Sequence, residues 1–259
     1  MLKPRITPCL LIRNKGLVKT LRFKPYKYIG DPINAVKIFN EKDADELIVL
    51  DIDATSKGLE PDFSVIKKLA AECQMPLCYG GGIKTVKDAL HIIKLGVEKV
   101  AISSAFIEDY NLLSQIIKEV GSQSVVVVID VKKTLFGRYE VFINNGNEGT
   151  GHSPIDLAQK AEELGAGEVV INSIDNDGVM GGYDLSLASE LRKSINIPIS
   201  IMGGAGSLKH MEELIKLCGV VGAIAGSLFI FKGSLSAVLI NYPSYADKSK
   251  MFKDSAEIS

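Results

Sequence analysis

An internal repeat constrains the fold of this 259-residue chain more than any other feature. DPINAVKIFNEKDADELIVLDID (31–53) aligns with SPIDLAQKAEELGAGEVVINSID (153–175), and MPLCYGGG (75–82) aligns with IPISIMGG (197–204). RITPCLLI (5–12) falls over SVVVVID (124–130), which sets Leu11 against Asp130. Two equivalent halves of this kind close naturally into one barrel with a pseudo-twofold axis.

Short apolar runs alternate with longer amphipathic stretches along the whole sequence. The runs are apolar on both faces, as parallel strands covered on both sides require, and they lie at 5–12, 46–53, 76–82, 99–104, 124–130, 168–175, 198–204 and 222–227. Several of the intervening stretches open on Asp, Ser or Thr and close on Gly, as helix caps prefer. A doubly wound open sheet also gives such alternation, but the repeat favours an α/β protein with one (β/α)8 TIM barrel domain over residues 1–259.

Two stretches have extra length, 17–28 after the first strand and 134–145 after the fifth. Both show strand-like alternation and occupy equivalent places in the two halves. They are expected to form loops or hairpins over the barrel mouth.

Composition excludes several classes of function. The 30 basic and 31 acidic residues nearly cancel, so no global field would recruit nucleic acid or an anionic membrane. No apolar run reaches the roughly 18 residues of a membrane span, and the N-terminus lacks a signal-peptide pattern. We therefore expect a soluble, cytoplasmic protein. The four cysteines lack C-x-x-C spacing and are expected to be reduced thiols, and the three scattered histidines argue against a zinc site. Neither a metal nor a cofactor is expected.

Glycine and serine gather at corresponding strand ends in the two halves. Backbone N–H groups approach an anion closely where glycine leaves room, and barrel loops after the last strands often hold phosphate. A single glycine turn would need no such explanation, but matched pairs predict a ligand with a phosphate at each end. The predicted phosphate-binding residues are Gly82, Ser103, Ser104, Gly178, Gly204, Gly226 and Ser227.

These motifs resemble the cyclase subunit of imidazole glycerol phosphate synthase. The resemblance covers residues 3–240 and rests on RITPCL, GDP, ADELIVLDI, GGGI, EKVAIS, VVVVID, GAGEVVINSIDNDG, GYD and GGAG. It implies a (β/α)8 barrel that receives ammonia from a glutaminase docked at its N-terminal face. The ammonia passes through the barrel to a ligand at the C-terminal face. An isomerase of the same family shares the half-barrel repeat. Its mechanism also requires two catalytic acids, and the motifs RITPCL and SIDNDG resemble the cyclase more than the isomerase.

One of the family's two catalytic acids is missing. The resemblance places them at Leu11 and Asp130, and only Asp130 is an acid. Leucine can neither give nor take a proton, and losing a general acid or base costs about 100- to 10,000-fold in rate. Ser103 and Met202 also replace the family's usual Asn and Ser, whereas the ligand-facing positions Lys19, Asp51 and Asp177 are kept. The enzymatic status of the chain, as a lyase or cyclase, is therefore open.

The opposite face retains the family's charges. The resemblance places an ammonia gate of four charged side chains at Arg5, Glu46, Lys99 and Glu168, and a glutaminase contact at Glu98. Exposed strand starts are often charged without such a role. Because all four positions keep the family's charge sign, a closed alternating ring of ion pairs is expected.

Four functions fit this pattern. The leading hypothesis is a synthase subunit of a glutamine amidotransferase complex that channels ammonia to a sugar-amidating partner. LLIRNKGLVKT (10–20) resembles a subgroup of these barrels associated with surface-polysaccharide amidation. The alternatives are an active cyclase of histidine biosynthesis, a bisphosphate sensor without a partner, and the isomerase activity.

Overall fold

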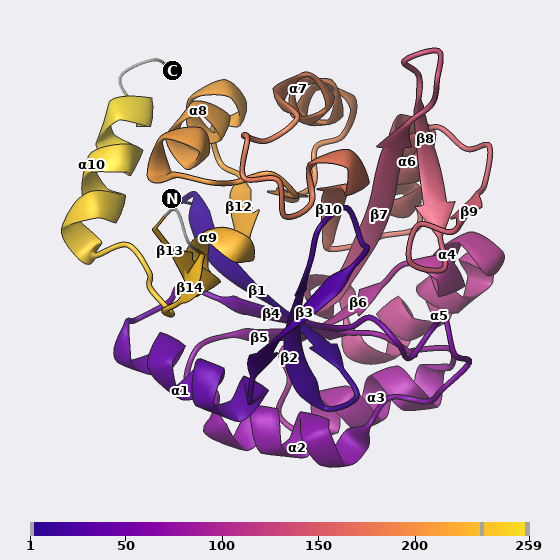
Figure 1. The fold of residues 1–259 in the computed structure, drawn as a ribbon. Coiled ribbons are helices and arrows are strands. Elements are labelled where there is room, and N and C mark those ends of the chain that lie inside the picture. The colour runs from indigo at the N-terminus through magenta and orange to yellow at the C-terminus, as the bar shows by residue number, and fades with distance from the viewer. Residues whose placement is uncertain (1–2, 234–235, 257–259) are drawn as a thin grey trace.

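Eight parallel strands form a closed barrel in the computed structural model, which describes residues 3–233 and 236–256 (Figure 1). In barrel order the strands are β1 (Arg5–Arg13), β4 (Leu47–Asp51), β5 (Leu77–Gly80), β6 (Lys99–Ile102), β7 (Val125–Lys133), β10 (Glu168–Ser173), β11 (Ile199–Met202) and β12 (Gly222–Ala225). β12 pairs with β1, and β7 pairs with β10, so the sheet has no open edge at barrel level. The predicted (β/α)8 barrel is confirmed, and all eight apolar runs form its strands.

Helices cover the outside of the barrel between successive strands. They are α1 (Pro32–Glu41), α2 (Phe63–Glu72), α3 (Val86–Lys94), α5 (Tyr110–Val120), α6 (Pro154–Glu163), α7 (Leu185–Ser194) and α8 (Leu208–Cys218). The side chains of Asp31 and Ser153 cap the repeat-equivalent helices α1 and α6, each of which starts on proline. Proline suits a first helical turn because its missing N–H has no partner there in any case.

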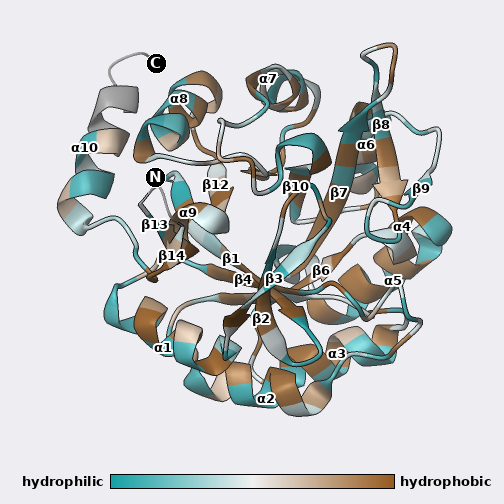
Figure 2. Ribbon diagram, viewed as in Figure 1, coloured by the Kyte–Doolittle hydropathy of each residue, from teal (hydrophilic) through white to brown (hydrophobic). Residues whose placement is uncertain are grey.

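Alternating strand residues divide the apolar core into two clusters. One set packs between the sheet and the helices, whose inward faces are hydrophobic in Figure 2. The other set fills the barrel interior and consists of Cys9, Ile48, Cys78, Ala101, Val126, Val128, Val170, Met202 and Ile224, with Leu11 and Leu50 at its edge. The same alternation directs Leu11 and Asp130 toward the barrel mouth. All four cysteines are free thiols.

Both extra stretches form antiparallel hairpins on barrel strands, as the sequence predicts. β2 (Gly16–Thr20) pairs with β1 and with β3 (Tyr26–Gly30), while β8 (Tyr139–Ile143) pairs with β7 and with β9 (Glu148–Gly149). Asn145, after β8, donates hydrogen bonds to the carbonyl of Ile52 and to Ser56 Oγ in the loop after β4. The second hairpin therefore reaches across the mouth.

Several elements lie outside the predicted pattern. Short helices α4 (Ser104–Glu108) and α9 (Ser227–Ile230) follow β6 and β12, and a two-residue pair, β13 (Phe231–Lys232) and β14 (Ala237–Val238), follows α9. A last helix, α10 (Tyr245–Ala256), packs beside α8. Among the described helices, none combines the length and apolar character needed to cross a bilayer.

Candidate functional site

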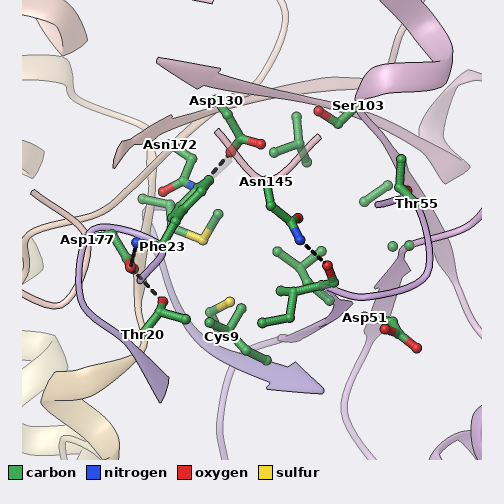
Figure 3. Close-up of a pocket in the computed structure, with 18 of the residues that line it drawn as sticks. Cys9, Thr20, Phe23, Asp51, Thr55, Ser103, Asp130, Asn145, Asn172 and Asp177 are labelled. Atoms are coloured by element: carbon green, nitrogen blue, oxygen red, sulfur yellow. Dashed lines mark hydrogen bonds between the residues drawn. The ribbon is translucent and has the colours of Figure 1, made fainter. Parts of the chain in front are cut away.

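A cavity of about 420 Å³ lies at the C-terminal ends of the barrel strands. Its walls include residues from both halves of the repeat, because parallel strands all end at the same face. Figure 3 shows Asp130 and Asn172 on one wall and Cys9 and Thr20 across from them. All the residues predicted to face a ligand or bind phosphate line this cavity.

Asp130 is the one of the family's two catalytic acids that this chain keeps. It lies in the second half of β7, and its Oδ1 accepts a hydrogen bond of 2.8 Å from Asn172 Nδ2 on the neighbouring β10. Burial raises the pKa of Asp130 to about 6, against the lowering effect of the Asn172 hydrogen bond, and the charge of Asp177 adds to the rise. A carboxyl group with this pKa can exchange a proton near neutral pH.

Leu11 occupies the corresponding place on β1. It lines the same cavity and packs with Leu50 against the cluster inside the barrel. β1 and β7 are four strands apart in a ring of eight, so Leu11 and Asp130 face each other across the mouth. The wall opposite the acid is therefore apolar at the position where the resemblance calls for a second carboxyl group.

Lys19, which is buried, and Asp177, which is half-buried, line the cavity beside this wall. Lys19 Nζ donates a hydrogen bond of 2.6 Å to the Cys9 carbonyl, and burial lowers the pKa of Lys19 although Asp177 opposes the shift. Asp177 accepts hydrogen bonds from Thr20 Oγ1 at 2.6 Å and from the Phe23 amide at 3.1 Å. Burial nevertheless raises the pKa of Asp177. These contacts attach the first hairpin to the loop after β10.

Asp51 lies at the end of β4 and has a local structural task. Its Oδ1 accepts hydrogen bonds from the amides of Asp53 and Ala54, at 3.0 and 3.2 Å. Burial raises the pKa of Asp51 against these two hydrogen bonds. The same carboxylate lines the cavity, so it can also face a ligand.

The two glycine-rich groups lie on opposite sides of the mouth, after β5 and β6 in one half and after β11 and β12 in the other. Gly82 and Gly204 have positive φ values, +74° and +109°, and a Cβ at either position would crowd a backbone carbonyl. Ser104 and Ser227 open α4 and α9. The Ser103 hydroxyl is buried and finds no hydrogen-bond partner within the described residues. Phosphate binding at these positions stays a prediction.

The four charged strand starts meet at the bottom of the barrel in one ring, here called the ion-pair ring (Arg5, Glu46, Lys99 and Glu168). Arg5 contacts Glu46 at 3.5 Å and Glu168 at 2.6 Å, and Lys99 contacts Glu46 at 2.6 Å and Glu168 at 3.0 Å. Charges therefore alternate around the ring. Its role as a gate stays a prediction.

Mutual pairing favours the ionised forms of Lys99 and Glu168 despite their burial. Burial alone would lower the pKa of Lys99, but the carboxylates of Glu168 and Glu46 raise it above the ordinary value. Burial alone would raise the pKa of Glu168, but Arg5 and Lys99 lower it. Glu168 also accepts a hydrogen bond from the buried Ser200 hydroxyl.

Glu98 lies next to the ring at the same face and is exposed. Its carboxylate accepts a hydrogen bond of 2.7 Å from the amide of Leu77, the first residue of β5. This bond satisfies a strand-start amide, so Glu98 has a local role besides the predicted partner contact.

An apolar layer separates the ion-pair ring from the cavity. Cys9, Val128, Met202 and Ile224 form part of the cavity floor. Ile48, Cys78, Val126 and Val170 belong to the same interior cluster but do not line the cavity, so they lie between its floor and the ring. Groups of three or more His, Cys, Asp or Glu side chains suited to a metal ion are absent from the described residues.

Sequence analysis missed several polar residues of the cavity, among them Asn172 and Asn145. Asn172 donates a hydrogen bond to Asp130, and its signal in the sequence was an amide side chain directly after the apolar residues 169–171. Asn145 belongs to the predicted mouth-covering stretch 134–145, but nothing in the sequence shows which loop it contacts.

The fold and this site define a (β/α)8 barrel with a ligand cavity at one face and an ion-pair ring at the other. The family model described as "Histidine biosynthesis protein" matches residues 5–236, and the chain belongs to this family. It is 55% identical over 253 residues to a protein from Leptospira interrogans named "Putative imidazole glycerol phosphate synthase subunit HisF", covering 97% of this chain and 100% of that relative.

Two further relatives have similar names. The "Putative imidazole glycerol phosphate synthase subunit hisF3" of Vibrio vulnificus is 53% identical and covers 96% of both chains. The "Imidazole glycerol phosphate synthase subunit HisF" of Alkaliphilus metalliredigens is 38% identical, over 88% of this chain and 91% of the relative. The chain is thus a HisF-like member of the family.

Proposed function

We propose that this single-domain chain is the synthase subunit of a glutamine amidotransferase complex that passes ammonia to a sugar-amidating enzyme. A glutaminase binds at the N-terminal face, around the ion-pair ring and Glu98. The acceptor is a sugar of a surface polysaccharide, and the complex works in the cytoplasm. The observation that carries this proposal is the contrast between an intact ion-pair ring and a mouth in which Asp130 faces Leu11 instead of a second carboxyl group.

The chemistry of ring closure supports the contrast. Closing an imidazole ring with ammonia requires one group to donate a proton and another to remove one. Asp130, with a pKa of about 6, can serve one of these roles. Leu11 cannot serve the other, whereas an ammonia passage needs no titratable group at that position. The two glycine-rich groups would hold a phosphate-bearing ligand at the mouth.

Active cyclisation is the second candidate, and the printed names of the relatives favour it. In that case Lys19 or Asp177, both within the same cavity, would have to supply the second proton-transfer group.

The test is an assay of the chain with its glutaminase. Glutamate production from glutamine and formation of imidazole glycerol phosphate are measured in the same reaction. The proposal predicts strong activation of the glutaminase with very little cyclised product. Cyclisation at an ordinary enzyme rate would favour the second candidate, and an absence of glutaminase activation would contradict both.

A further inference from the structure

The two halves of the repeat differ at the level of the ion-pair ring. In the second half, the Gly167 amide donates directly to the Val125 carbonyl at 3.0 Å. β7 and β10 are paired from this level onward, beginning with Val126 opposite Glu168. The strand wall is therefore continuous where Glu168 enters the ring.

In the first half the corresponding backbone groups do not meet. The repeat sets Asp45 on Gly167 and Ile6 on Val125. β1 and β4 are first paired at Cys9 with Ile48, two residues beyond Glu46 of the ion-pair ring. The Tyr242 hydroxyl lies between the two groups. It donates to the Ile6 carbonyl at 2.7 Å and accepts from the Asp45 amide at 3.1 Å.

The C-terminal segment holds this hydroxyl in place. The Tyr242 ring packs against Phe39 of α1 and Phe229 of α9, both fully buried. Lys248 Nζ, on α10, lies 5.0 Å from the centre of the aromatic ring of Tyr242. The same atom donates a hydrogen bond of 2.6 Å to Asp45 Oδ1. The other carboxylate oxygen of Asp45 accepts from the Ile6 amide at 3.1 Å.

This hydroxyl bridge between Ile6 and Asp45 lies beside the Arg5–Glu46 contact of the ion-pair ring. Ile6 follows Arg5 and Asp45 precedes Glu46, so the hydroxyl fixes the backbone next to both charged residues. Arg5–Glu46 is the longest of the four ring contacts at 3.5 Å, whereas the other three lie between 2.6 and 3.0 Å. The widest contact thus coincides with a place where a side-chain hydroxyl bridges the two backbone groups that bond directly in the other half.

We infer that Tyr242 is a positioning residue for the ion-pair ring and that Arg5–Glu46 is the seam at which the ring opens. The hydroxyl ties β1 to the residues before β4 at a level where the two strands are not paired. The opening role rests on the proposed function, because it requires that ammonia cross the ring. The bridge itself does not.

Hydrogen exchange tests the bridge on the isolated full-length chain. Tyr242→Phe removes the hydroxyl and keeps the ring that packs on Phe39 and Phe229. Exchange of the Asp45 amide should become at least about tenfold faster, because its hydrogen-bond acceptor is lost, while the Gly167 amide should be unaffected. An unchanged exchange rate of the Asp45 amide would overturn the inference. Equal acceleration at the Asp45 and Gly167 amides would overturn it as well, because it would indicate a general loss of stability.

Tyr183→Phe is the matched control. Tyr183 is also buried and donates through its hydroxyl to a strand carbonyl, that of Ile224, at 3.0 Å. It should leave exchange at Asp45 unchanged. If Tyr242→Phe does not fold, Lys248→Met gives a second route to the same amide, since it removes the cation that holds Asp45. A smaller acceleration at Asp45 alone is then expected, and its absence would count against the bridge.

Ammonia escape tests the opening role in the complex with the glutaminase and the amidating enzyme. The ratio of ammonia in solution to glutamate formed should rise at least about twofold in Tyr242→Phe and stay constant in Tyr183→Phe. If Lys99→Ala raises this ratio and Tyr242→Phe does not, the inference that the ring opens at Arg5–Glu46 is wrong and the proposed function stands. If neither variant raises it, the ring does not lie on the ammonia path and the proposed function fails.

Discussion

The Asn172 amide donates to the carboxylate of Asp130 across neighbouring strands, at 2.8 Å. This bond is the main influence that lowers the pKa of Asp130 against burial. The acid of the mouth is therefore adjusted by a residue 42 positions away.

Removing that amide should move the titration of Asp130. In Asn172→Leu the pKa of Asp130 should rise further above about 6, because burial then acts without the opposing hydrogen bond. Carboxyl carbon NMR over a pH series measures the shift. Thr20→Val, which removes a hydrogen bond from Asp177, should raise the pKa of Asp177 instead. If the pKa of Asp130 stays the same in Asn172→Leu, the hydrogen bond from Asn172 does not stabilise the ionised carboxylate.

Asp130 should make the fold less stable at neutral pH. Its pKa is raised from 3.8 to about 6 on folding, so its ionised form is disfavoured in the native state. The resulting cost is absent below pH about 4, grows as the pH rises through about 6, and is on the order of 3 kcal/mol above that. Asp130→Asn should therefore increase the free energy of unfolding at pH 7 more than at pH 4. Urea titrations at both pH values give the difference, and equal effects would contradict the buried ionised state.

Restoring the second acid at position 11 should restore cyclase activity. The unmodified chain should cyclise the histidine-pathway substrate very weakly, and Leu11→Asp should raise the rate by about 100-fold or more, since a general acid or base contributes on this scale. Product formation with added ammonium salt measures it without the glutaminase. Leu11→Asn has a similar shape and no titratable proton, so it serves as the control. An ordinary cyclase rate in the unmodified chain would end the lost-acid hypothesis.

Breaking the ion-pair ring should cost both stability and coupling. Lys99→Ala leaves Glu46 and Glu168 facing Arg5 alone, and removing one partner of a buried pair costs about 3–5 kcal/mol. Denaturant unfolding gives the stability, and the fraction of ammonia reaching the solvent gives the coupling with the glutaminase bound. Lys160→Ala breaks an exposed pair with Glu163 and should change both only slightly. If Lys99→Ala behaves like this control, the four residues are ordinary surface charges.

Two anions should bind at equivalent places in the mouth. Crystals grown in phosphate or sulfate should show one anion near Gly82 and Ser104 and another near Gly204 and Ser227, because both groups place glycine turns beside the start of a short helix. Ser227→Ala should weaken the second site and leave the first unchanged. Well-ordered loops without an anion at either place would argue strongly against the paired phosphate sites.

Local sequence patterns determined the barrel and its symmetry. Runs apolar on both faces predict covered parallel strands wherever they occur, and the repeat sets their order into two halves. The same register predicts that Leu11 and Asp130 occupy equivalent positions, because alternation along a strand fixes which side chains face inward. The charged strand starts are likewise visible in the sequence, since each stands directly before or at the start of an apolar run.

Only the tertiary structure decided the contacts that link distant segments. Tyr242 bridges Ile6 and Asp45 across 236 and 197 positions, and no local pattern reports such a bond, because its geometry depends on how α10 and the C-terminal segment pack against the barrel. Asn172 and Asp130 meet for the same reason, through the pairing of β7 with β10. The burial that sets the pKa of Asp130 is a property of the assembled barrel mouth as a whole. Sequence therefore determined which groups are present at each strand end, and three-dimensional packing decided which of them touch.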